Sequence, residues 1–130
     1  MLGVIILKLS NERLVNSVGV LSKLTNLELP IKLSYVLIKS ITKIDAELKA
    51  YNIEREKLLN KYGEKDEEGK LKLSEKGEVN ILDRENFNKE IAELLQCESE
   101  IDIHLIDLES INTDIKITPG ELMIIDYMFK

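Results

Sequence analysis

The stretch from residue 31 to residue 62 constrains this chain most, because it contains neither Gly nor Pro and follows a single helical pattern. Its seam residues are spaced alternately four and three apart, as in a coiled-coil heptad; they are Leu37, Ile41, Ile44, Leu48, Tyr51, Arg55, Leu58 and Tyr62. Such a helix is about 45–50 Å long, whereas a domain of this size has a radius of gyration of about 14 Å. We therefore expect a second copy or another protein to cover part of the apolar stripe.

Shorter elements are predicted on both sides of the long helix. Residues 3–9 form a strand, Ser10 caps a helix that ends near Asn26, and Pro30 opens the long helix. Gly63 is expected to end the long helix in a left-handed conformation. Five further features follow in the sequence: a charged turn over residues 63–69, a hairpin that turns at Lys76 and Gly77, a helix capped by Asp83, a strand over residues 101–106 and, beyond it, a short helix opened by a capping box at Thr118. The sequence predicts one α+β domain over residues 1–130, mainly helical, with one long central helix, shorter helices and a small antiparallel sheet.

The charge is unevenly distributed along the chain. The net charge is −6, but residues 1–62 hold 10 basic and 6 acidic residues, whereas residues 63–130 hold 8 and 18. The basic first half and acidic second half could pair with another copy or with a bipolar partner, or both could be ordinary solvated faces. The acidic total argues against nucleic acid or an anionic membrane as the default partner.

The sequence shows no targeting signal and no membrane-spanning segment. The first nine residues lack a basic region and a cleavage site, and no stretch approaches the ~20 apolar residues of a membrane span. Cys97 is the only cysteine, so no disulfide framework is possible within one chain. We expect a reducing cytoplasm and no membrane association.

The acidic turn after the long helix has the spacing of a calcium-binding loop. Oxygen ligands stand at positions 1, 3, 5 and 12 of the EF-hand pattern; they are Glu64, Asp66, Glu68 and Glu75. Two features oppose calcium: Glu is long for positions 1 and 5, and Gly77 interrupts the helix that should leave the loop. We predict a solvated turn, with no metal and no cofactor.

Signals for catalysis are weak. Asp102 and His104 lie two apart on a predicted strand, so they share a face and could orient an imidazole, but no nucleophile is marked beside them. Neither of the glycine-rich phosphate-binding patterns occurs. The long helix mixes Lys with Asp and Glu, and no basic–aromatic interleaving is present, so nucleic acid is not expected either. We predict no catalytic residue.

Three residues interrupt the aliphatic seam of the long helix: Tyr51, Arg55 and Tyr62. An Arg between two Tyr is typical of a partner interface, where these residue types are enriched. The same pattern suits the edge of a core from which Arg extends into water. These residues are the candidate partner-binding site.

Three segments carry a family resemblance: residues 29–41 (LPIKLSYVLIKSI), 62–69 (YGEKDEEG) and 118–126 (TPGELMIID). Through them and the order of elements between them, most of the chain resembles a family of small phage and prophage proteins of low-GC Gram-positive bacteria, a domain of unknown function. The resemblance implies a phage-encoded protein that acts in the cytoplasm of an infected host or during virion assembly. It implies no functional residues.

These observations favour a non-enzymatic protein-interaction module encoded by a phage. Our leading hypothesis is that it binds and inhibits a host defence protein through the long helix and the acidic second half, and that it also self-associates as a homo-oligomer. One alternative is a virion component or assembly helper associated with the tail or head. Another is a small enzyme or nucleotide-binding protein that uses Asp102 and His104.

Overall fold

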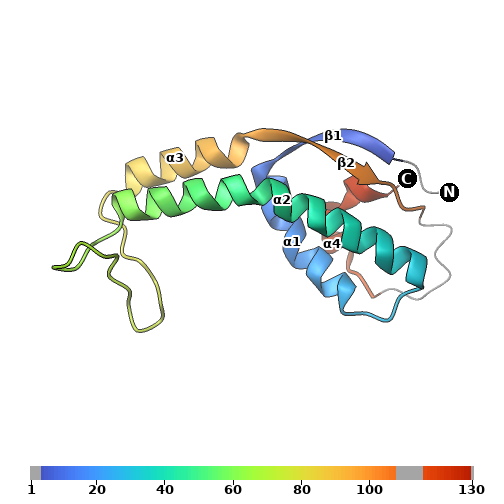
Figure 1. Ribbon diagram of the computed structural model, residues 1–130, viewed down its shortest axis with the longest axis horizontal. Helices are drawn as coiled ribbons and strands as arrows, with labels where there is room; N and C mark the ends of the chain where they lie inside the picture. The colour runs from blue at the N-terminus through green and yellow to red at the C-terminus, as the bar shows by residue number, and fades with distance from the viewer. Residues whose placement is uncertain (1–3, 108–115, 130) are drawn as a thin grey trace. The chain divides into compact units, whose positions relative to one another are not determined.

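The computed structural model describes residues 4–107 and 116–129, and the fold is α+β and mainly helical, as predicted (Figure 1). In chain order the elements are β1 (Val4–Ser10), α1 (Asn11–Thr25), α2 (Ile31–Tyr62), α3 (Arg84–Gln96), β2 (Glu98–His104), α4 (Pro119–Ile124) and the 3-10 helix η2 (Asp126–Met128). They form two compact units. The sheet unit comprises Met1–Leu48 and Glu98–Lys130, and the hairpin unit comprises Lys49–Cys97.

The predicted capping residues fix the ends of three helices. The Ser10 side chain accepts a hydrogen bond from the Arg13 backbone N–H at 3.2 Å. Asp83 caps α3 in the same way, through the Asn86 N–H. Thr118 and Glu121 form the predicted capping box of α4, which ends at Ile124 and is followed by η2. These bonds satisfy backbone donors that have no partner within a helix.

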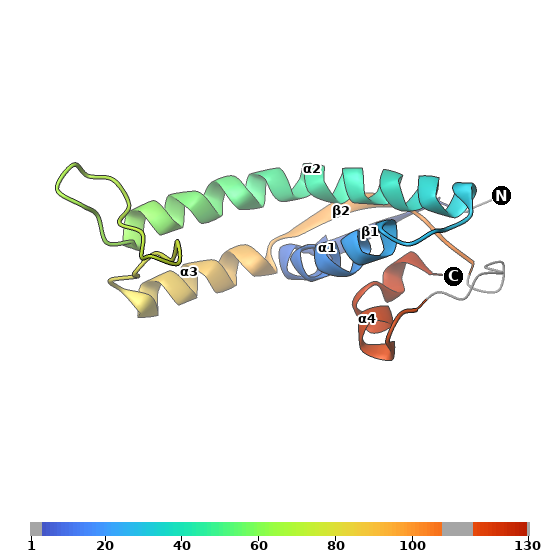
Figure 2. The same cartoon turned by 90° about the horizontal axis from the view of Figure 1, so that it is seen from below.

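The sheet unit is built on a two-stranded antiparallel ribbon. β1 pairs with β2 from Val4↔His104 to Ser10↔Glu98. Both views place this ribbon beside α1 and the first part of α2 (Figures 1 and 2). One face of the ribbon is apolar and buries Leu9, Ile101 and Ile103. The largest fully buried hydrophobic side chains come from all parts of the unit: Leu14, Leu21, Ile44, Ile103, Ile106, Ile125 and Met128.

The chain itself buries the apolar stripe of α2 between Leu37 and Tyr51, which is about half of the helix. Leu37, Ile44, Leu48 and Tyr51 are at most 8% exposed. Leu37, Ile44 and Leu48 therefore need no second chain to cover them, because the sheet unit brings distant segments together into its own core. Beyond Tyr51 the seam is more open: Arg55 is exposed, whereas Leu58 and Tyr62 are half-buried.

The hairpin unit contains two tight turns between α2 and α3. Three isolated bridges join the backbone of this segment, at Gly63↔Ile81, Lys65↔Leu71 and Leu73↔Val79. The last of these confirms the hairpin predicted around Gly77, and the second shows another hairpin where only a charged turn was expected.

The two turns share one construction. Asp66 Oδ1 accepts from the backbone N–H groups of Glu68 and Lys70. In the second turn, Ser74 Oγ accepts from the corresponding N–H groups two and four residues later. Each turn ends on a glycine with positive φ, 82° at Gly69 and 76° at Gly77. A short polar side chain and a left-handed glycine therefore fix both turns.

Gly63 ends α2 for a different reason from the one predicted. Among the described residues the positive-φ glycines are Gly69 and Gly77, so the expected left-handed cap at Gly63 is wrong. Gly63 is buried, and a Cβ there would lie 2.6 Å from Leu71 Cδ2 and 2.7 Å from Val79 Cγ1, and would also clash with the Leu59 carbonyl oxygen. Close approach of the hairpins requires glycine at this position.

The two units do not coincide with the basic and acidic halves of the sequence. By sequence, the sheet unit holds 8 basic and 12 acidic residues, and the hairpin unit holds 10 and 12. Both units are therefore mildly acidic, because α2, with seven basic and four acidic residues, contributes to both. None of the helices within the described ranges combines the length and apolarity needed to cross a bilayer.

The single cysteine stands at the end of the hairpin unit. Cys97 is the C-cap residue of α3, is exposed, and carries a free thiol. Its Sγ lies 3.5 Å from the Glu93 carbonyl oxygen. The next residue, Glu98, begins β2 and belongs to the sheet unit.

Candidate protein-binding groove

A groove of about 520 Å³ lies within the hairpin unit, between α2, the second turn and α3. Seven residues line it: Arg55, Leu59, Gly77, Glu78, Val79, Ile81 and Phe87. The large apolar side chains among them are half-buried, whereas Arg55 and Glu78 are exposed. The groove therefore combines an apolar lining with one cation and one anion that water can reach.

An aromatic and charged cluster positions Phe87 in this groove. The Tyr62 and Phe87 rings meet edge to face, with centroids 6.1 Å apart and planes at 78°. Lys61 Nζ lies 5.0 Å from the centroid of the Tyr62 ring and 3.2 Å from Glu90 Oε1. Edge-to-face pairs and cation–π contacts each add to the stability of such a contact. The cluster joins the last turn of α2 to α3.

Hydrogen bonding within the cluster shifts the acid–base equilibria of its members. The Glu90 carboxylate, acting chiefly as a hydrogen-bond acceptor, raises the pKa of the Tyr62 hydroxyl. The same hydrogen bond lowers the pKa of Glu90, and its bonds to Tyr62 and Glu90 raise the pKa of Lys61. Near neutral pH, Glu90 and Lys61 are therefore charged and Tyr62 is neutral.

The structure brings two of the three predicted partner-binding residues to the groove. Arg55 lines it, and Tyr62 contacts it through Phe87. Tyr51 is only 8% exposed, so its side chain offers almost no surface to a partner. The sequence predicts the hairpin at Gly77 that contains Val79 and the helix after Asp83 that contains Phe87, but no spacing shows that these two residues converge with Arg55.

The acidic residues with calcium-loop spacing lie in hairpin contacts. Glu64 lies 3.7 Å from Lys72 Nζ and accepts a hydrogen bond from Asn80 at 3.1 Å. Glu68 lies 3.9 Å from Lys70, and Glu75 belongs to the second turn. Within residues 4–107 and 116–129, no group of three or more acidic, His or Cys residues is arranged to hold a metal ion.

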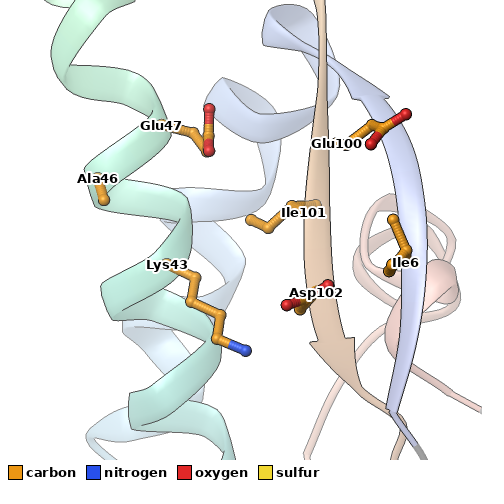
Figure 3. A pocket seen from close by; sticks show the side chains of 7 residues that line it. All are labelled: Ile6, Lys43, Ala46, Glu47, Glu100, Ile101 and Asp102. Carbon is orange, nitrogen blue, oxygen red and sulfur yellow. The ribbon is translucent and has the colours of Figure 1, made fainter.

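A second cavity, of about 360 Å³, lies in the sheet unit between α2 and β2 (Figure 3). Its lining residues are Ile6, Lys43, Ala46, Glu47, Glu100, Ile101 and Asp102. Lys43 extends from α2 toward β2, which carries Asp102 (Figure 3). Asp102 thus faces this cavity, but its predicted partner His104 is not among the lining residues. Asp102 nevertheless acts electrostatically on His104 by opposing the lowering of its pKa, and an acid–base role for this pair stays a prediction.

The surroundings of His104 favour its neutral form. Burial is the main cause that lowers the pKa of the imidazole, and the ammonium groups of Lys43 and Lys39 lower it further, against the opposing effect of Asp102. In an unfolded chain the imidazole has its ordinary pKa of about 6.5. The folded state therefore loses stability as the pH falls from above 6.5 through the lower pKa of the folded protein.

We expect an NMR titration of the His104 ring to give a midpoint below the ordinary value of about 6.5. His104 is the only histidine, so its resonance needs no assignment. Lys43→Gln should raise the midpoint, because it removes a nearby positive charge, whereas Lys49→Gln on the same helix should leave it unchanged. A midpoint at or above the ordinary value in the unmodified protein would contradict this prediction.

Comparison of the chain with protein-family models, with curated proteins and with solved structures found no match. The likeness to phage and prophage proteins therefore stays a prediction from the three sequence segments given above.

Proposed function

We propose that this protein is a non-enzymatic protein-interaction module and that the groove of the hairpin unit receives side chains of a protein partner. The single observation that carries the proposal is the convergence of Arg55 with half-buried apolar residues from three segments. Arg and aromatic residues contribute most of the energy at many protein interfaces, especially where a partner desolvates them. A partner that filled the groove would bury Leu59 and Phe87 more completely and leave Arg55 and Glu78 to form polar contacts around them.

The resemblance extends this proposal to a biological setting. A phage-encoded protein can inhibit a host defence protein in the host cytoplasm by occupying a surface of that protein. Such inhibition needs binding residues and no catalytic ones. The groove supplies such residues. We therefore propose host-protein inhibition as the specific role of the groove.

Site-specific photo-crosslinking tests this function. A photoreactive phenylalanine analogue replaces Glu78, which lines the groove, and in a matched control it replaces Glu67, an exposed glutamate in the other turn. In cells that naturally express the protein, we expect a covalent adduct with a different protein from position 78 and not from position 67. Arg55→Glu should reduce the adduct at least severalfold, because it reverses the charge beside the groove.

Three results would count against the proposal. Equal adducts from both positions would show that contact is unspecific, and no adduct from position 78 would show that the groove has no partner. An adduct that contains only a second copy of this chain would replace host-protein inhibition with self-association.

A further inference from the structure

The first two turns of α2, in the sheet unit, expose an apolar row on the side opposite the buried stripe. Ile31, Tyr35 and Ile38 are 82%, 61% and 53% exposed. Their spacing of four and three residues places them on one side of the helix. Val36 and Ile44, by contrast, are at most 6% exposed. The first part of α2 therefore presents apolar residues both to its own core and to its surroundings.

Three lysines accompany this row. Residues 31–44 contain Lys32, Lys39 and Lys43 and no acidic residue. We call the surface formed by Ile31, Lys32, Tyr35, Ile38 and Lys39, with the half-buried Lys43 at its edge beside β2, the basic–apolar face. None of its lysines forms an ion pair with another residue in the described ranges, although Lys39 Nζ lies 5.1 Å from the centroid of the Tyr35 ring.

The start of the helix adds to this positive charge. The first turn of α2 has no acidic residue, so no side-chain charge there offsets the partial positive charge of the helix N-terminus. α1, α3 and α4 each carry a glutamate in this position. Burial is the main cause of the lowered pKa of His104 on the neighbouring strand β2, and the charges of Lys43 and Lys39 lower it further.

We propose that the basic–apolar face binds an amphipathic helix of a partner protein, one whose apolar stripe is flanked by Asp and Glu side chains. Anchors at i, i+4 and i+7 are the pattern by which one helix packs against another. Carboxylates beside the stripe of the partner would meet the three lysines, and electrostatic complementarity of this kind sets partner choice. The face lies in a different unit from the groove, so either proposal can fail without the other.

Two other classes of partner fit less well. A nucleic acid would engage the lysines through phosphates but would leave the apolar row exposed to water. An anionic membrane is flat and would also lie against Asp45 and Glu47 next to the face, whereas a partner helix can cross α2 at an angle and avoid them. Both classes are outcomes of the following test.

The probe is a synthetic peptide of three heptads with Leu at positions a and d and Glu at e and g, titrated into the full chain. We expect binding to shift the backbone NMR resonances of residues 31–43 and to raise the titration midpoint of His104. Tyr35→Ala, or Lys39→Glu with Lys43→Glu, should weaken binding by about tenfold or more. The matched controls on the same helix, Ile53→Ala and Lys49→Glu, should change it less than twofold, because both residues are exposed but lie outside the face.

Three kinds of result would overturn the proposal that this face binds an acidic amphipathic helix. A scrambled peptide of the same composition that binds equally well would show that the apolar row has no role. Tighter binding of a DNA duplex, or of vesicles of phosphatidylcholine and phosphatidylserine, would assign the face to those partners. Equal effects of the test and control substitutions, or no binding of the acidic peptide, would show that this face does not recognise such a helix.

Discussion

Replacing Ile44 with Asp is expected to unfold the sheet unit. Ile44 is 0% exposed at the middle of the buried stripe of α2. An ionised carboxylate at this position would lose its hydration without gaining a hydrogen-bond or ion-pair partner. The loss of the buried aliphatic side chain lowers the free energy of unfolding further. We expect a destabilisation of more than about 4 kcal/mol, a large fraction of the total stability of a small protein.

Urea denaturation followed by circular dichroism measures this effect, and the NMR signal of His104 reports on the sheet unit in particular. In the variant, the His104 resonance should take the position of an unfolded chain. Ile44→Val should cost only about 1 kcal/mol, because it keeps an aliphatic side chain. Ile53→Asp is the matched control: Ile53 is on the same helix but 57% exposed, so the change should stay within about 0.5 kcal/mol. Similar unfolding curves for Ile44→Asp and Ile53→Asp would contradict the burial of Ile44.

The substitution Gly63→Ala is expected to destabilise the hairpin unit by about 2–3 kcal/mol, as overpacking of a filled site does. The added methyl group would clash with the backbone oxygen of Leu59 and with the side chains of Leu71 and Val79. A backbone atom in a helix cannot move aside as a flexible side chain can. The hairpins would therefore have to shift away from the end of α2.

Gly19→Ala provides the opposite result as a control. Gly19 lies within α1, and a Cβ there would meet nothing within 4 Å. Because alanine favours the helix over glycine, this variant should gain about 0.5–1 kcal/mol. Thermal denaturation of both variants tests the pair, and loss of the Tyr62–Phe87 ring-current shifts would locate the Gly63→Ala effect. An unchanged or raised melting temperature for Gly63→Ala would refute the close approach.

The sequence predicts structural features that depend on residues close together in the chain. It does not predict those that depend on contacts between residues far apart in the chain. Ser10, Asp83 and Thr118 cap their helices through backbone groups three residues away, so the local pattern suffices. Gly63 was misassigned because its neighbours Leu71 and Val79 reach it only after the hairpins form. No periodicity indicates such contacts.

The candidate site shows the same division. Arg55 and Tyr62 interrupt an apolar seam, a pattern that predicts an interface; Arg55 lines the groove, and Tyr62 contacts the lining residue Phe87. Tyr51 interrupts the seam in the same way but is buried, because a heptad position suits a core as well as an interface. The apolar lining from the second turn and α3 depends on the path of the chain between residues 63 and 82. The heptad pattern does not predict the basic–apolar face, because it identifies only the opposite side of the helix.

The exposed thiol of Cys97 has a practical consequence for every measurement of assembly. An accessible cysteine with no second cysteine in its chain can pair only with another molecule when it is oxidised. Preparations exposed to air will accumulate covalently linked dimers, whose mass equals that of a genuine two-chain complex. Ultracentrifugation with and without a reductant, or with Cys97→Ser, separates the artefact from association through the folded surface.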